Sequence, residues 1–265
     1  RDVLGSRGLG DVYKRQNMNS LFSLLGKQIL ITGAASGIGR CVAVEASKLG
    51  ANITLVDLNE AGLQETLGML SGGSHATLKC DLTSSEDREN LIVQVSKLDG
   101  VVNCAGIGMT LPFKFCTENE LGRIMNINFF GPVYLVQSLA KGKKINKNAS
   151  VVYMASIDGT VTGHIGNSCY AASKGAIMGS VRAQALEFAS RGVRVNCVSP
   201  ARVNTPLIKR NNISEEQVEA NKQEYPMKRY ADPIEIAGYI LYLLSDVSTY
   251  TSGSNLVIDG CFTIQ

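Results

Sequence analysis

The stretch TGAASGIG, at Thr32–Gly39, lies between a short apolar run, Gln28–Thr32, and a segment of helical period, Gly37–Leu49. A glycine-rich turn between a strand and a helix is typical of a backbone that holds phosphates, because the helix N-terminus offers unpaired N–H groups and a partial positive charge. Apolar runs and helical segments then alternate to the end of the chain. The stretch therefore predicts an α/β chain with a dinucleotide site.

The three glycines of this turn have separate predicted roles. Gly33 permits a tight turn, Gly37 removes a Cβ where a pyrophosphate approaches, and Gly39 lets the helix pack closely on the strand. An ordinary loop is the alternative, and the flanking strand and helix argue against it. The predicted cofactor contacts of the turn are Gly33, Ser36, Gly37, Ile38 and Gly39.

Asp57 ends the second apolar run, Asn52–Asp57, 18 residues after Gly39. A carboxylate at this point accepts hydrogen bonds from both ribose hydroxyls of an adenosine, and it repels a 2′-phosphate. The residue therefore favours NAD(H), with NADP(H) as the alternative. A turn-initiating aspartate before Asn59 is the competing interpretation.

The rest of the chain continues the alternation. Further apolar runs lie at His75–Cys80, Gly100–Asn103, Ser150–Ala155, Val193–Val198 and Asn255–Asp259. Further helical segments lie at Glu60–Leu70, Ser85–Leu98, Glu118–Leu139, Tyr170–Ser190 and Pro233–Leu244. Several runs are apolar on both faces, as in strands covered by helices on both sides. We expect a single-domain Rossmann fold, with one doubly wound, mostly seven-stranded parallel sheet and helices on both faces.

Two segments fall outside this alternation. Residues 1–16 lack periodicity and end in a run that resembles a translated library adapter, so we expect 1–17 to be a non-native or disordered tail. Residues 18–265 then form the single NAD(P)-binding domain. The polar segment 202–230, with a short helix near Ser214–Glu224, is expected to be a substrate lid, and a static surface excursion is the alternative.

Composition excludes several classes of protein. At 265 residues, 45% hydrophobic and 18% charged, the chain has ample material for a core. Its net charge of +3, or +1 without the first 16 residues, is too small to suggest a nucleic-acid or membrane partner. No apolar run reaches the roughly 18 residues of a spanning helix, and nothing resembles a secretory signal. We expect a cytoplasmic protein.

The cysteines and histidines predict neither a disulfide framework nor a metal site. The chain has seven cysteines without CxxC or metal-ligand spacing, and two histidines, so we expect reduced thiols and no bound metal. His164 lies in the loop before Tyr170, where substrate contact and surface placement both remain open. The cysteines expected to be small buried packing residues are Cys41, Cys80, Cys169 and Cys197.

Tyr170 and Lys174 are four residues apart at the start of a predicted helix and share a face. A phenol has an ordinary pKa near 10, and a nearby ammonium favours its phenolate form. We therefore expect Lys174 to lower the pKa of Tyr170 toward working pH. Such a pair alone is usually a solvated helix face. Ser156, just past a buried strand, gives the pair its significance, because ligands bind at that end of such sheets.

Taken together, these motifs resemble the short-chain dehydrogenase/reductase family from about Leu25 to Cys261. The motifs that carry the resemblance are TGAASGIG, Asp57, Asp81-Leu82, Asn103–Gly106, Asn128, Ser156, Tyr170, Lys174, Ser199-Pro200 and Val257–Gly260. Two positions depart from the family pattern: Cys104 stands where Asn is frequent, and Ala201 stands where Gly is usual.

The resemblance implies a role for each matching residue. Tyr170 is the implied general acid/base, and Ser156 orients the substrate oxygen. Lys174 also binds the nicotinamide ribose, and Asn128 holds a water of the proton relay. The implied cofactor contacts beyond the glycine turn and Asp57 are Asp81, Leu82, Asn103, Ala105, Gly106, Tyr170, Lys174, Pro200, Val203 and Thr205.

The implied function is an NAD(P)(H)-dependent oxidoreductase that interconverts a secondary alcohol and a ketone. Because the run PMKRYADPIEIA is similar to 3-oxoacyl-thioester reductases, an acyl-carrier-protein reductase using NADPH is the alternative. A non-catalytic nucleotide-binding regulatory protein is the alternative of another class. The resemblance also implies a homotetramer or homodimer, formed through Leu121–Leu139, Tyr170–Ser190 and Asn255–Cys261.

Overall fold

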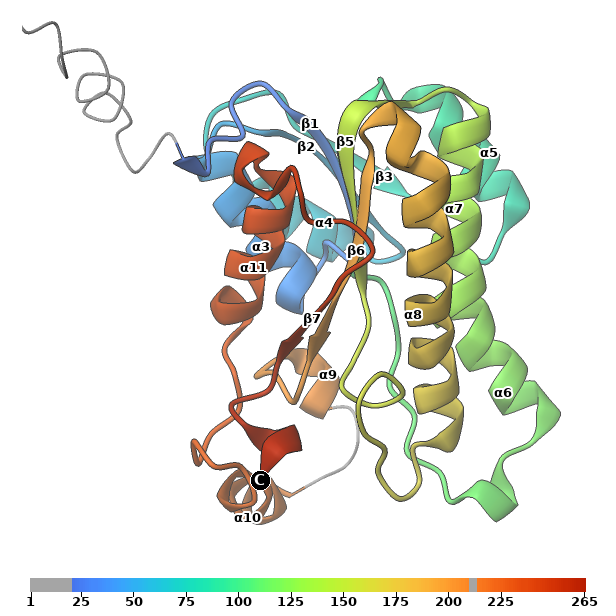
Figure 1. Ribbon diagram of the computed structural model, residues 1–265, viewed down its shortest axis with the longest axis vertical. Coiled ribbons are helices and arrows are strands. Elements are labelled where there is room, and N and C mark those ends of the chain that lie inside the picture. The colour runs from blue at the N-terminus through green and yellow to red at the C-terminus, as the bar shows by residue number, and fades with distance from the viewer. Residues whose placement is uncertain (1–20, 210–213) are drawn as a thin grey trace, which may run out of the picture.

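The computed structural model describes residues 21–209 and 214–265, and the predicted tail at 1–17 lies outside them. Seven strands of the described chain form one parallel sheet in the order β3-β2-β1-β4-β5-β6-β7 (Figure 1). The strands are β1 (Gln28–Thr32), β2 (Asn52–Asp57), β3 (Ala76–Lys79), β4 (Leu98–Asn103), β5 (Ile145–Met154), β6 (Arg194–Pro200) and β7 (Asn255–Ile258). The order reverses direction between β1 and β4, which confirms the predicted doubly wound sheet.

Helices cover both faces of the sheet (Figure 1). The first face carries α3 (Gly37–Lys48), α4 (Glu60–Leu67) and α11 (Pro233–Leu244). The second face carries α5 (Ser85–Gln94), α7 (Gly131–Lys141) and α8 (Ser168–Phe188). The remaining α-helices lie at the end of the molecule that holds the carboxyl ends of the strands, and are α6 (Glu118–Met125), α9 (Pro206–Lys209) and α10 (Glu215–Gln223).

Strand β5 shows why a run apolar on both faces indicates a central strand. Its side chains alternate between two hydrophobic cores, one under each helical layer. Val152 and Met154 enter the core with α3 and α11, and Val151 and Tyr153 enter the core with α7 and α8. Both faces are thus dry, so no polar alternation is left for the sequence to show.

The structure corrects two predicted boundaries. The helix predicted over Ser85–Leu98 ends at Gln94, because Leu98 joins the sheet and its N–H donates to Lys144 O at 2.7 Å. Strand β5 correspondingly begins at Ile145 rather than Ser150, and Leu98 pairs with Ile145 across a register shift. The polar residues at the start of β5 concealed this extension in the sequence.

The helix predicted over Glu118–Leu139 has a π-helical segment, Asn126–Phe130, between α6 and α7. A π-helical turn widens the backbone locally and is frequent at functional sites. Here it contains Asn128, whose side chain is 1% exposed. The sequence shows one continuous helical period here, so it does not reveal that the α-helix is interrupted at Asn128, a predicted site residue.

The segment predicted as a lid begins and ends at one place. Ala231 N donates to Arg202 O at 3.0 Å and Asn204 N donates to Ala231 O at 2.8 Å, so both ends of the segment are held together. Between them lie α9 and α10, and the predicted short helix corresponds to α10. In the described part of the chain, no helix combines the length and apolar character required to cross a membrane.

Candidate active site

A cleft of about 600 Å³ opens at the carboxyl edge of the sheet, between the ends of β1, β2, β4, β5 and β6. Such a volume is typical of cofactor and substrate sites. All predicted site residues line this cleft except Asn103 and Asn128, which are buried behind it. The structure thus brings together residues from Gly33 to Thr205 that are distant in sequence.

The glycine turn is packed so tightly that side chains are excluded from two of its positions. A Cβ on Gly33 would lie 2.7 Å from Ala105 N, and Gly33 has a φ of +67°. A Cβ on Gly39 would collide with the carbonyl of Gly33. Gly37, with a φ of +54°, lines the open cleft instead. The tight turn at Gly33 and the close packing at Gly39 are as predicted, and the approach of a pyrophosphate at Gly37 stays a prediction.

Asp57 is fixed against the glycine turn. Its Oδ2 accepts a hydrogen bond from Ala35 N at 3.1 Å, and its Oδ1 accepts one from Asn59 N at 3.0 Å. The bond to Asn59 N is the local turn that the competing interpretation predicted. The bond to Ala35 N holds the carboxylate beside the glycine turn, and its contact with a ribose stays a prediction. The carboxylate still lines the cleft at the end of β2 and keeps free lone pairs for a ligand.

Lys174 lies at the base of the cleft, on the second turn of α8. Its Nζ donates to Met154 O at 2.8 Å, and the residue is only 4% exposed. Burial lowers the pKa of the Lys174 ammonium to about 8, and the nearby Cys104 opposes that shift. The ammonium also lies 5.8 Å from the centre of the Tyr170 ring. Lys174 therefore stays mostly an ammonium at pH 7, although burial weakens its hold on the proton.

The pKa of Tyr170 differs from the expectation. Burial raises it to about 12, hydrogen bonding to Ser156 lowers it, and the charge of Asp158 raises it further. The net lowering that was predicted for the pKa of Tyr170 is therefore wrong for the protein alone, because removing the phenolate from water outweighs the neighbours that favour it. At neutral pH Tyr170 is a phenol, the form that donates a proton.

Asn128 connects two elements behind the cleft. Its Nδ2 donates to Ile107 O at 3.0 Å and to Ser173 Oγ at 3.1 Å, and its Oδ1 accepts from Ile107 N at 2.8 Å. These bonds tie the loop after β4 to helix α8. The structure therefore shows Asn128 positioning the two sides of the cleft, and its predicted water contact stays a prediction.

The substrate end of the cleft contains residues that the motifs did not identify. Asp158 N donates to Ser156 Oγ at 3.2 Å, which fixes the serine hydroxyl. The buried Asp158 carboxylate binds His164 Nδ1 and accepts from Asn167 Nδ2 at 2.8 Å. His164 lines the cleft with a side chain that is 40% exposed. The position of His164 before Tyr170 was the only sequence signal for this group.

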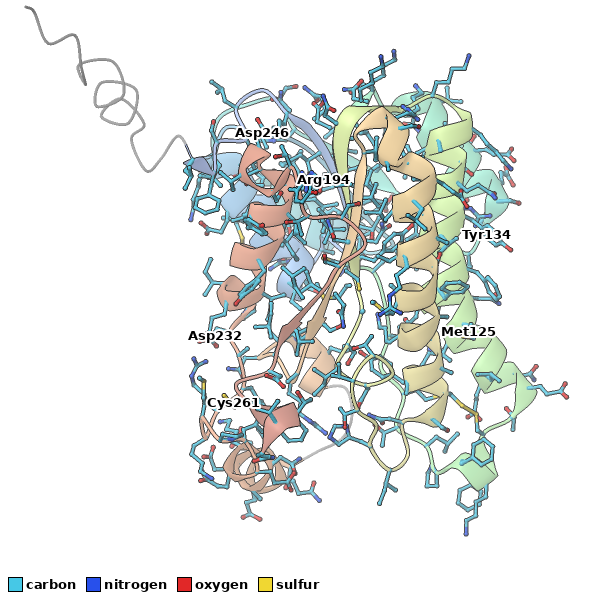
Figure 2. The ribbon with its side chains drawn as sticks, in the orientation of Figure 1. Met125, Tyr134, Arg194, Asp232, Asp246 and Cys261 are labelled. Atoms are coloured by element: carbon cyan, nitrogen blue, oxygen red, sulfur yellow. A yellow bond between two sulfur atoms is a disulfide. The ribbon has the colours of Figure 1, made fainter. Side chains whose placement is uncertain are left out.

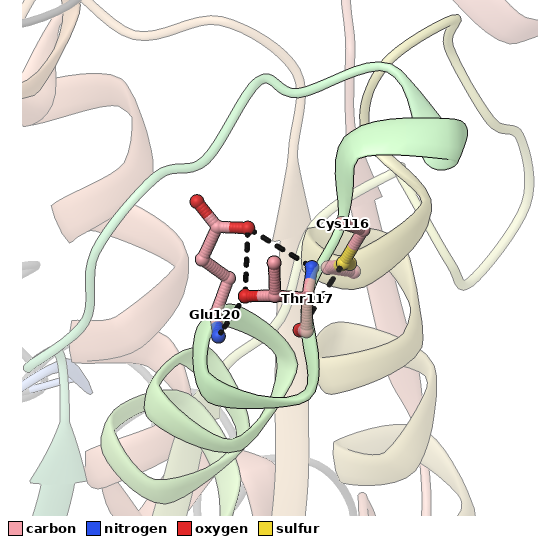
Figure 3. The surroundings of a disulfide bond; sticks show 4 residues. Cys116, Thr117 and Glu120 are labelled. Carbon is pink, nitrogen blue, oxygen red and sulfur yellow. Dashed lines mark hydrogen bonds between the residues drawn. A yellow bond between two sulfur atoms is a disulfide. The ribbon is translucent and has the colours of Figure 1, made fainter.

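A disulfide joins Cys116 to Cys169, the residue before Tyr170 (Figure 3). The expectation of reduced thiols is wrong for these two cysteines, because folding brings residues 53 positions apart together. Cys169 is buried as expected, but as half of a cross-link. Cys116 precedes Thr117, which forms a capping box with Glu120 at the start of α6. The disulfide thus connects the starts of α6 and α8.

Comparisons with known proteins agree with this geometry. The family described as Enoyl-(Acyl carrier protein) reductase matches residues 33–263. The D-threitol dehydrogenase of Mycolicibacterium smegmatis is 33% identical over 252 residues, which cover 92% of this chain and 95% of that protein. The 3-oxoacyl-(acyl-carrier-protein) reductase FabG of Rickettsia bellii is 32% identical over 241 residues, which cover 91% and 98%. The solved structure of levodione reductase matches with a TM-score of 0.83 and 30% identity, covering 90% of this chain and 98% of that one.

Proposed function

This chain belongs to the short-chain dehydrogenase/reductase family, and we propose that it interconverts a secondary alcohol and a ketone by hydride transfer. It is an oxidoreductase that acts on CH–OH groups with a nicotinamide cofactor. The observation that carries the proposal is the meeting of Ser156, Tyr170 and Lys174 in the cleft that also holds the glycine turn.

The residues of the cleft fit a nicotinamide dinucleotide. Gly37 leaves the cleft open beside the start of α3, where unpaired N–H groups face a phosphate. The Asp57 carboxylate is at the adenosine end, and Lys174 is at the nicotinamide end. The remaining contacts that we propose are Ser36, Ile38, Asp81, Leu82, Asn103, Ala105, Gly106, Pro200, Val203 and Thr205. When bound, the nicotinamide ring donates or accepts the hydride.

Side chains of this protein carry out the proton transfers. In ketone reduction, the neutral phenol of Tyr170 donates its proton to the substrate oxygen, and in alcohol oxidation its phenolate removes one. Ser156 binds the same oxygen, held in place by the N–H of Asp158. The Lys174 ammonium, fixed on Met154 O, stabilises the phenolate that proton donation leaves behind.

The electrostatics of the adenosine end support a preference for NAD(H). Among the described residues that line the cleft, the basic side chains are those of Lys174, His164 and Arg202. Arg202 follows β6, which lies four strand positions from β2 and Asp57 in the sheet. At about 4.8 Å per strand that is roughly 19 Å. The cations near Asp57 are Arg40 and Lys79, which are paired with Glu65 and Glu60 and do not line the cleft.

A 3-oxoacyl-thioester reductase that uses NADPH is the second candidate. The similarity to the Rickettsia bellii reductase and the matched family's description favour it. A non-catalytic nucleotide-binding protein is disfavoured by the complete set of Ser156, Tyr170 and Lys174. Turnover assays over a panel of alcohols, ketones and 3-oxoacyl thioesters, each with NAD(H) and NADP(H), test all three. Cofactor binding without turnover of any of them would contradict the enzymatic proposal.

Exposed apolar side chains support the proposed homotetramer or homodimer. Phe130 and Tyr134 stack at 5.9 Å between ring centres on the outer side of the α6–α7 layer, where Tyr134 projects away from the sheet (Figure 2). Leu121 on α6 and Leu186 on α8 are also exposed. These residues lie on the helices predicted as association surfaces. Light scattering of the full chain tests this, and a monomer at micromolar concentration would contradict it.

Two further expectations stay proposals. The segment 202–230 contributes Arg202 and Tyr225 to the wall of the cleft, which supports its role as a cover over the substrate. Five cysteines of the described chain are free thiols, which supports the proposed cytoplasmic location, although the Cys116–Cys169 disulfide is unusual there. Fractionation of the expressing cells tests the location.

A further inference from the structure

Past Ser156 and Tyr170, the cleft continues between aromatic rings. The ring of His164 lies 5.4 Å from that of Phe262, and the ring of Phe262 lies 4.5 Å from that of Tyr225. Tyr225 in turn meets Tyr230 edge to face at 5.4 Å. Three segments far apart in sequence build this aromatic cluster, and two of its members, His164 and Tyr225, line the cleft.

Arg202 is the one guanidinium among the described residues that line the cleft. Its Cζ lies 6.0 Å from the centre of the Tyr230 ring, and the residue is exposed. Across the described chain, no carboxylate lies within ion-pair distance of it. By contrast, Arg229 in the same segment is bound by both oxygens of Glu235, at 2.6 and 2.8 Å. Arg202 therefore keeps its planar donors for a ligand.

Asp158, the buried carboxylate that lines this part of the cleft, is bound by other side chains. Asp158 is 7% exposed, and both its oxygens are engaged, one by His164 and the other by Asn167. The Asp158 carboxylate therefore forms no ion pair with Arg202. Tyr225, whose pKa burial raises to about 12, stays a neutral phenol beside the guanidinium. An anion here meets the free guanidinium of Arg202 and neutral rings, while the Asp158 carboxylate, whose charge also acts on Tyr225, is bound to His164 and Asn167.

Arg202 is within reach of the reacting atoms. Ile157 N, one residue after Ser156, donates to Pro200 O at 3.1 Å, so the chain segments that carry Ser156 and Arg202 run side by side. Neighbouring strands are about 4.8 Å apart, and an extended arginine side chain spans a comparable distance. A charged group a few bonds from a carbonyl held by Ser156 thus falls within reach of Arg202.

We propose that the substrate is a small alcohol or ketone that carries a carboxylate or a phosphate, and that Arg202 binds this anionic group. This proposal rests on the proposed function. Guanidinium binds both groups through two parallel N–H···O bonds, which fix orientation as well as charge. The rings of His164 and Tyr225 line the cleft beside this contact. Neutral polyols and sugars lack the group that Arg202 requires.

Matched pairs of compounds test the subsite. Short 2-, 3- and 4-oxo acids are compared with their methyl esters, and dihydroxyacetone phosphate with dihydroxyacetone, using the full chain saturated with reduced cofactor. For at least one pair we expect kcat/KM for the anion to exceed that of its neutral partner at least tenfold. The carboxylate and phosphate arms distinguish the two sources of charge. Equal or lower kcat/KM for every anion would overturn the proposal.

Variants separate charge recognition from general damage. Arg202→Gln should lower kcat/KM for the preferred anion 10- to 100-fold and leave its neutral partner unchanged, and Arg202→Lys should restore part of the loss. Arg229→Gln, whose guanidinium is bound to Glu235, is the matched control and should change neither. An equal loss on both members of the pair would show a structural role and overturn the subsite.

A binding readout distinguishes failure of the subsite from failure of the proposed function. Calorimetric titration of the anion and its neutral partner into the complex of Tyr170→Phe with reduced cofactor needs no turnover. Tighter binding of the anion, lost in Tyr170→Phe/Arg202→Gln, supports the subsite even if no turnover is found. Turnover with equal binding of both compounds supports the function and refutes the subsite.

Discussion

The two ends of the cleft are built in different ways. At the adenosine end, backbone packing decides the site: a Cβ on Gly33 would lie 2.7 Å from Ala105 N, and Asp57 is held by Ala35 N. At the substrate end, side chains from separate segments meet, such as His164, Tyr225 and Phe262. A site made by backbone constraint needs particular residue types in a short stretch. A site made by tertiary packing tolerates many residue types, so the choice of substrate can vary while cofactor binding stays the same.

The largest expected effect is confined to the substrate end. Tyr170→Phe removes the proton donor without changing the glycine turn, so kcat should fall by roughly 10² to 10⁴ while the affinity for NADH changes far less. Steady-state rates and fluorescence titration of NADH measure the two ends separately. Tyr153→Phe, which removes a hydroxyl bonded to Gln184, is the matched control, because neither residue lines the cleft. A fully active Tyr170→Phe would break the assignment.

The disulfide should stabilise the framework of the substrate end. Cys116→Ser in protein purified without reductant should lower the free energy of unfolding by about 2–4 kcal/mol, because the cross-link closes a long loop in the unfolded chain. Urea denaturation measures the change, and added dithiol should reproduce it in the wild type. Cys261→Ser, at an exposed free thiol, serves as the control. Equal stability of all three proteins would show that the cross-link does not form in solution.

Asp57→Ser should affect the adenosine end alone. It removes the proposed ribose acceptor and a negative charge that faces a 2′-phosphate, so the ratio of NADPH to NADH affinity should rise roughly 10- to 100-fold. Fluorescence titrations of the two cofactors give the ratio. Because Asp57 also accepts from Ala35 N, thermal unfolding should confirm an intact turn. A ratio that stays the same contradicts the role given to Asp57.

Per unit of pH, the smallest expected effect is the change of the oxidation rate with pH. Alcohol oxidation requires the phenolate of Tyr170, whose pKa burial raises to about 12, so its fraction and kcat/KM should rise with pH from 7 to 10, by up to about tenfold per unit. Ketone reduction uses the phenol and should not share this rise. Initial rates in both directions across that range measure the profiles. An oxidation rate independent of pH would remove Tyr170 as the base.

The sequence alone could predict the elements whose residue types are dictated by backbone geometry. The parallel sheet follows from runs such as β5, and the glycine turn follows from positions where a Cβ does not fit. The pairing of Cys116 with Cys169 could not be predicted, because it depends on how α6 packs beside α8. The pKa of Tyr170 was misjudged for the same reason, since burial is a property of the folded protein.

The substrate end shows the limit most clearly. Arg202 reaches the cleft because β6 lies beside β5, and the neighbouring Arg229 is bound by Glu235 while Arg202 has no carboxylate within ion-pair distance in the described chain. Neither fact is visible in a run of residues. The π-helical segment that aims Asn128 at Ile107 is likewise hidden within one helical period.

The central claim is that this cleft binds a nicotinamide dinucleotide at the glycine turn, with Asp57 on the adenosine ribose. Parallel titrations of NADH and NADPH into the full chain, followed by fluorescence, test it most directly. We predict saturable binding of both with at least tenfold tighter binding of NADH. Tighter binding of NADPH would contradict the role of Asp57, and binding of neither would contradict the site itself.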